Sequence, residues 1–135
     1  MQPIPFSHKL HVTDNQIGCT LCHAYAARGP VAGIPSDARC NGCHKFVGMD
    51  KPVIQKLNQT FAKGEPLVWE RLYWLPDMVF FTHERHVAAG LRCQQCHGPV
   101  EAMTVTRREA PLTMGWCLDC HLAKHAPTDC LTCHK

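Results

Sequence analysis

The sequence lacks a long uninterrupted run of apolar residues. Its longest apolar stretch, residues 67–81, is broken by three charged residues and a proline, whereas a membrane-spanning helix needs about 20 consecutive apolar residues. Residues 1–5 also lack the positive and apolar regions of a secretory leader. We therefore expect no membrane span in this chain, and a leader or anchor would have to lie outside this sequence.

Long stretches of regular apolar periodicity are also scarce among the 135 residues, which include ten prolines and nine glycines. The exception is residues 52–62, where Ile54, Leu57 and Phe61 recur at helical spacing and Gly64 follows as a stop signal. A chain of this length can bury an ordinary apolar core, but this one has few apolar runs to build it. We expect something other than side chains to fill its interior.

Cysteine, by contrast, is abundant, and all ten cysteines fall into five copies of Cys-x-x-Cys-His. This is the attachment motif of c-type haem: two thiols add to the vinyl groups of one porphyrin, and the histidine supplies the proximal nitrogen. Zinc sites and disulfide scaffolds also use paired cysteines, but neither requires a histidine after every second one. We therefore predict five covalently bound haem c groups. The first to fifth motifs are Cys19/Cys22/His23, Cys40/Cys43/His44, Cys93/Cys96/His97, Cys117/Cys120/His121 and Cys130/Cys133/His134.

The histidine count predicts a second protein ligand for each iron. Ten histidines are present, five of them in the motifs, and the other five are His8, His11, His83, His86 and His125. One distal histidine per haem predicts five bis-histidine irons. Methionine in place of a histidine would raise the potential, so bis-histidine ligation indicates low-potential haems. Methionine ligands are available but not required by the count: Met49, Met78, Met103 and Met114.

Four of those five distal histidines lie in a repeated stretch, Phe-[Ser/Thr]-His-x-x-His-Val. We call its two copies, residues 6–12 and 81–87, the first and second clamps; each shortly precedes a haem motif. Histidines three positions apart project from one side of a helical turn, so the two cannot bind the same face of one iron. Each clamp is therefore predicted to hold two different haems close together.

The clamps divide the chain into a two-haem module at 1–64 and a second part at 65–135, an aromatic connector plus a three-haem module. We expect one compact unit. Its fold class is expected to be mainly α with much irregular structure and a haem-filled core. Short β elements are expected near the N-terminus and at 78–81. In the connector, Trp69, Tyr73 and Trp74 either cover haem faces and the joint between the modules, or form a docking surface for a partner protein.

The clamp followed by an attachment motif resembles the class III multihaem cytochromes, the c3 and c7 family. Residues 69–83, 96–100 and 114–121 further resemble the pentahaem subunit of alternative complex III and the multihaem subunit of the quinone reductase complex of sulfate reducers. The resemblance implies that His8 serves the first motif and His83 the third. His11 and His86 would reach a second haem in or near their own half. It also implies partners in a membrane-bound quinol or quinone oxidoreductase complex.

We therefore expect an electron-transfer protein rather than an enzyme, with no catalytic residues, on the periplasmic or outer face of the cytoplasmic membrane where haem c is attached. Two alternatives stay open: a catalytic multihaem reductase with an open haem site, and a subunit of an extracellular cytochrome filament. The formal charge of +3 does not indicate nucleic-acid binding. Ten ionised propionates would bring it to roughly −7 (3 minus 10).

Overall fold

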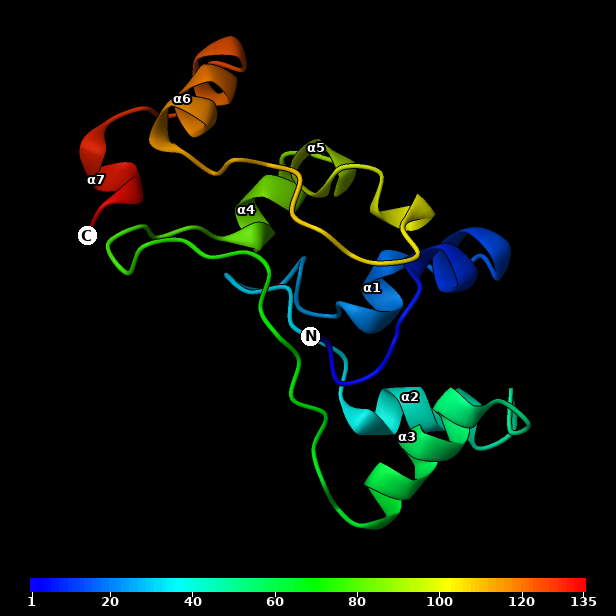
Figure 1. Ribbon diagram of the computed structural model, residues 1–135. Helices are drawn as coiled ribbons and strands as arrows, with labels where there is room; N and C mark the ends of the chain where they lie inside the picture. The colour runs from blue at the N-terminus through cyan, green and yellow to red at the C-terminus, as the bar shows by residue number, and fades with distance from the viewer.

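Short helices joined by irregular chain make up the fold, and the computed structural model describes all 135 residues (Figure 1). The mainly α, irregular fold class predicted above is confirmed. All five haem motifs begin or lie within helices. In chain order the elements are η1 (Lys9–Asp14), a π-helix; α1 (Cys19–Cys22); α2 (Asp37–His44); α3 (Pro52–Ala62); α4 (His83–Ala88); α5 (Gln94–His97); η2 (Val100–Ala102), a 3₁₀ helix; α6 (Met114–Ala123); and α7 (Cys130–Cys133).

The helix predicted at 52–62 is confirmed as α3. Pro52 opens it at a position where the missing N–H is no loss, and Gly64 follows its end with a φ of +71°, which glycine adopts readily. Ile54 and Leu57 are buried, at 7% and 2% exposure, and pack against Ile4. Only five of the 135 side chains are buried at all, so the polypeptide has little apolar core of its own.

The predicted β elements do not form. No strand is present near the N-terminus, where prolines at 3 and 5 lack the N–H donors of a ladder. Residues 78–81 make only a single antiparallel bridge, Val79 to His134, with the N–H of Phe80 donating to the carbonyl of Cys133 at 2.7 Å. The partner chain turns into α7 at this point, so the pairing has nowhere to extend.

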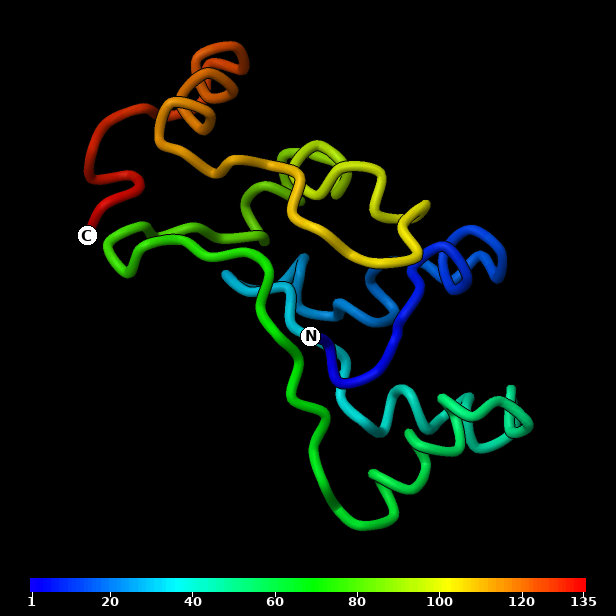
Figure 2. The backbone as a smooth tube through the Cα atoms, viewed as in Figure 1, coloured from blue at the N-terminus to red at the C-terminus, as the bar shows by residue number.

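The helices are spread along one long direction of the molecule. Helices α2 and α3 lie at one end, α6 and α7 at the other, and α1, α4 and α5 between them, while the connector runs alongside as extended chain (Figures 1 and 2). The longest helix has 11 residues, and none of the helices combines the length and the apolar character needed to cross a membrane.

Candidate haem sites

The helical turn in each motif sets the direction of its thiols. Cysteines three positions apart lie on the same side of a helix, which suits attachment to one porphyrin edge. All ten thiols are free, and no cluster of three or more histidine, cysteine or acidic side chains could hold a metal ion. A structural zinc site needs four such ligands. The donor geometry therefore does not fit the zinc and disulfide alternatives.

The first histidine of each clamp lies face to face with a motif histidine. The rings of His8 and His23 have centroids 6.5 Å apart and planes 13° apart. The rings of His83 and His97 have centroids 6.3 Å apart and planes 11° apart. The two pairs are thus nearly identical, although one belongs to the first clamp and the other to the second.

The second histidine of each clamp faces a different motif at a steeper angle. His11 lies 6.1 Å from His44, with 73° between the ring planes. His86 also lies 6.1 Å from His121, with 51° between the planes. Each clamp therefore contacts two motifs, and the four ring pairs together involve the first four motifs.

The ring separation is the one that a single six-coordinate metal requires. A metal–imidazole bond is about 2 Å long, and the nitrogen lies about 1.2 Å from the ring centre by ordinary bond lengths. Two rings on opposite sides of one iron thus have centroids about 6.3 Å apart, and the four observed pairs span 6.1 to 6.5 Å. Rings packed face to face would lie nearer to about 3.5–4 Å. The residues present therefore fit bis-histidine haem ligation.

Hydrogen bonds orient these rings. In seven of the eight, Nδ1 lies within hydrogen-bond distance of an oxygen, and in six that oxygen is a backbone carbonyl. A carbonyl only accepts, so Nδ1 carries the proton and Nε2 is left bare as a metal ligand. The exception is His8, whose Nδ1 lies 2.9 Å from the hydroxyl of Thr106. The six carbonyls belong to Ser7, Pro30, Gly33, Val47, Thr82 and Pro127.

Burial keeps the central rings neutral. It lowers the pKa of His8 and of His97, and neighbouring histidines lower both further. Neutral imidazole is the form that binds a metal. Burial also raises the pKa of five thiols and keeps them protonated before thioether formation; these are Cys22, Cys40, Cys93, Cys96 and Cys117.

A phenylalanine is packed against both histidines of each clamp. Phe6 lies 5.0 Å from His8, edge to face, and 4.4 Å from His11, stacked. Phe81 holds the equivalent place in the second clamp, 4.8 Å from the first histidine and 4.5 Å from the second. The wedge holds the two imidazoles of a clamp at different angles, which explains why one ring pair is nearly parallel and the other is crossed.

The connector aromatics divide between the two roles expected of them. Trp69 packs on the α3 core and edge-on to Phe6. Tyr73 lies 4.6 Å from the ring of His97, and its hydroxyl accepts from the N–H of Glu109. These two cover a core and a haem-motif ring. Trp74 is 62% exposed, with the guanidinium of Arg71 over its ring at 4.6 Å.

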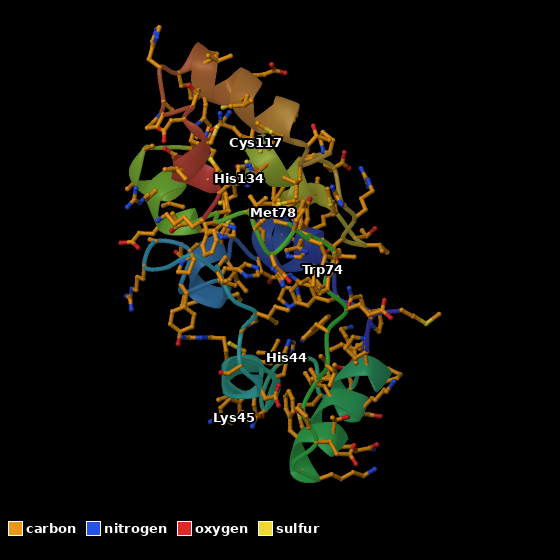
Figure 3. All side chains as sticks on the ribbon, turned by 90° about the vertical axis from the view of Figure 1, so that its left-hand side faces the viewer. His44, Lys45, Trp74, Met78, Cys117 and His134 are labelled. Carbon is orange, nitrogen blue, oxygen red and sulfur yellow. The ribbon has the colours of Figure 1, made fainter.

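The fifth motif differs from the other four, because no ring faces its histidine. Nδ1 of His134 lies 3.1 Å from the carbonyl of Met78, which orients it as in the other motifs. His125 follows α6 with a φ of +53° and is in no ring pair. Figure 3 shows His134 and Met78 together, close to Cys117 and far from His44.

The sequence was compared with known proteins. Residues 79–135 match the family described as cytochrome c7 and related cytochrome c. Over 97 residues, 71% of this chain, the sequence is 40% identical to the multiheme cytochrome c subunit of menaquinone reductase from Nitratidesulfovibrio vulgaris. The aligned part is 45% of that relative, so the chain spans about half the length of the curated protein it matches.

Proposed function

The chain belongs to the class III multihaem cytochromes, the family of cytochromes c3 and c7, and from this premise we propose that it carries five haems and relays electrons among them. The observation that carries the proposal is the set of four histidine ring pairs, each spaced for one iron. The scarcity of buried side chains supports it as well, because five porphyrins would supply the apolar interior. When bound, haem supplies the one-electron redox chemistry.

The polypeptide anchors and orients these groups. The two cysteines of a motif hold one porphyrin by thioether bonds, and the motif histidine binds its iron from one side. From the other side His8 and His11 serve the first and second motifs, and His83 and His86 the third and fourth. Because the histidines of one clamp are about one helical turn apart, each clamp fixes the distance between two irons.

His125 is assigned to the iron of the fifth motif, since the other four motif histidines already face a ring. The N–H groups of His125 and Ala126 donate to the carbonyls of Leu122 and His121, closing α6 as a Schellman turn. The left-handed position of that turn usually holds glycine, yet here it holds His125. A side chain retained at such a position indicates a role for the imidazole.

The redox partner is proposed to be a quinol or quinone oxidoreductase complex in the membrane. Support comes from the 40% identity to a relative whose name places it in a menaquinone reductase. Haem c is attached covalently outside the cytoplasmic membrane, so the chain is assigned to the periplasm or the outer face of that membrane. It acts as an electron-transfer subunit, and the reaction with quinone belongs to other subunits.

Intact mass spectrometry of the purified holoprotein tests the haem number. Five haems of about 0.6 kDa each add about 3 kDa to the 15.1 kDa polypeptide. A mass of 15.1 kDa would refute haem attachment. An excess of about 2.4 kDa would instead refute the count, because it corresponds to four haems.

A ligand-binding assay separates the relay from a catalytic reductase, an alternative favoured by the lack of a ring opposite His134. Five low-spin irons that do not bind cyanide or nitrite quickly support the relay. Rapid binding by the wild-type protein would refute it. The variant His125→Gly is expected to convert one iron in five to the high-spin, cyanide-binding form. Glycine suits the left-handed turn, so α6 should end as before and the change can be attributed to the lost ligand.

A further inference from the structure

Each clamp is hydrogen-bonded to the opposite half of the chain. The N–H of Lys9, next to the first clamp histidine, donates to the carbonyl of Met103 at 3.0 Å. In the second clamp the N–H of Glu84 donates to the carbonyl of Gly29 at 3.1 Å. These acceptors are equivalent, because each lies ten residues after the first cysteine of a motif (29 minus 19, and 103 minus 93). The two halves therefore exchange the same contact.

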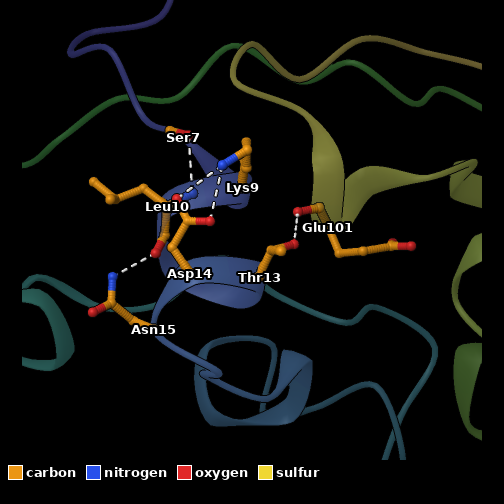
Figure 4. A network of polar contacts seen from close by, with 7 residues as sticks. All are labelled: Ser7, Lys9, Leu10, Thr13, Asp14, Asn15 and Glu101. Carbon is orange, nitrogen blue, oxygen red and sulfur yellow. Dashed lines mark hydrogen bonds and ion pairs between the residues drawn. The ribbon is translucent and has the colours of Figure 1, made fainter.

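Side chains repeat this exchange. The Nδ1 atom of His8 is bonded to Thr106, in the second half, and that of His83 to the carbonyl of Pro30, in the first. The hydroxyl of Thr13 also donates to the carbonyl of Glu101 at 2.6 Å, so that η1 lies against η2 (Figure 4). The first histidine of each clamp is thus oriented by a loop of the other half.

Equivalent residues meet where the halves join. The thiol of Cys93 lies beside the thiol of Cys19, close enough for a hydrogen bond between them. Each is the first cysteine of its motif. His97 likewise lies within electrostatic range of His23. Contact between equivalent positions is the mark of a two-fold relation, here between two halves of one chain, with the first and third motifs at the centre.

The other motifs lie outward from this centre. Cys22 of the first motif is within electrostatic range of Cys43 and Cys40, both of the second motif. On the opposite side, Cys96 and Cys120 line one hollow together with Trp116. The third and fourth motifs therefore lie side by side.

The fifth motif continues this line beyond the fourth. Cys117 of the fourth motif is within electrostatic range of Cys133 of the fifth. In both views the second motif, in α2, lies at one end of the molecule and the fourth and fifth at the other (Figures 1 and 3).

We propose that the five haem motifs lie in space in the order second, first, third, fourth, fifth, around an internal two-fold axis between the first and third. This order rests on the proposed function, since it assumes a haem at every motif. It makes the second motif, Cys40–His44, and the fifth, Cys130–His134, the two ends of the relay. Electrons enter and leave at these ends, and the central pair joins the halves.

Redox coupling between neighbouring haems tests the order. Reducing one haem adds negative charge, which lowers the potential of nearby haems most, because the interaction falls with distance. An NMR-monitored redox titration of the five-haem protein reports each haem separately. In the His11→Met variant the second haem gains a methionine ligand, which raises its potential, so that it is reduced first. The first haem should then show the largest shift. In the matched His86→Met variant, the third and fifth haems should shift most.

The order is refuted if reduction of the second haem shifts the third, fourth or fifth haem more than the first. It is also refuted if the fourth haem couples most strongly to the second. The wild-type titration gives an independent check that needs no variant, because the first and third haems should be the most strongly coupled pair across the two halves. Intact mass tests the proposed function separately: five haems with another neighbour map refute the order alone, whereas fewer than five refute the proposed function and the order with it.

Discussion

Replacing Thr106 with valine should raise the potential of the haem at the first motif, in the opposite half of the chain. The hydroxyl of Thr106 lies 2.9 Å from Nδ1 of His8. Without this acceptor His8 becomes a weaker electron donor, and the ferric state is less stabilised. A hydrogen bond of this kind contributes about 0.5–1.5 kcal/mol, and 1.4 kcal/mol corresponds to about 59 mV for one electron. A rise of about 20–60 mV at a single haem is therefore expected.

An EPR-monitored redox titration can measure this shift. The angle between axial ring planes governs the shape of the ferric signal, so the nearly parallel pairs, at 13° and 11°, should be resolved from the crossed pairs, at 73° and 51°. Half of the nearly parallel class should shift in Thr106→Val. Thr104→Val is the matched control, because Thr104 is exposed on the same loop. Equal shifts in both variants, a shift in the crossed class, or none in Thr106→Val would refute the reasoning.

Three further outcomes follow from the same geometry. The wild-type protein should give two ferric EPR signals of the nearly parallel type and two of the crossed type; four equivalent signals would contradict the ring geometry. His11→Gly should make one iron high-spin in the visible spectrum, and added imidazole should restore it; no response to imidazole would mean that His11 is not a ligand. Leu57→Ala, at a side chain 2% exposed, should lower the free energy of unfolding by about 2–4 kcal/mol in denaturant titrations. Leu10→Ala, at 49% exposure, should change it by less than about 0.5 kcal/mol, and equal losses would place the core elsewhere.

The sequence could predict the parts of the candidate sites that depend on spacing. Five motifs, five further histidines and two His-x-x-His stretches determine how many ring pairs are possible and that a clamp must reach two motifs. The helix at 52–62 was predictable for the same reason, because Ile54 and Leu57 recur at helical spacing. These features are local, and residues within about ten positions decide them.

The exchange between the halves could not be predicted. Lys9 and Glu84 donate through their backbone N–H groups to backbone carbonyls, and such bonds leave no mark on residue type. Thr106 is one of several threonines in its loop, and nothing in the sequence relates it to His8, 98 residues away. The connector posed a different problem: Trp69 and Trp74 are alike as residues, and only packing shows that one covers a core and the other faces solvent.

The bond between His8 and Thr106 also affects how the protein is made. The chain is synthesised from its N-terminus, so the first motif and His8 emerge long before the loop that orients them, across a separation of 98 residues. Haem can be joined to Cys19 and Cys22 while the second half is still absent, but the final ligand geometry has to wait for it. Attachment and tuning are thus separate events in maturation. A product that stops after the second motif would be coloured, yet its haems would not have the potentials of the finished protein.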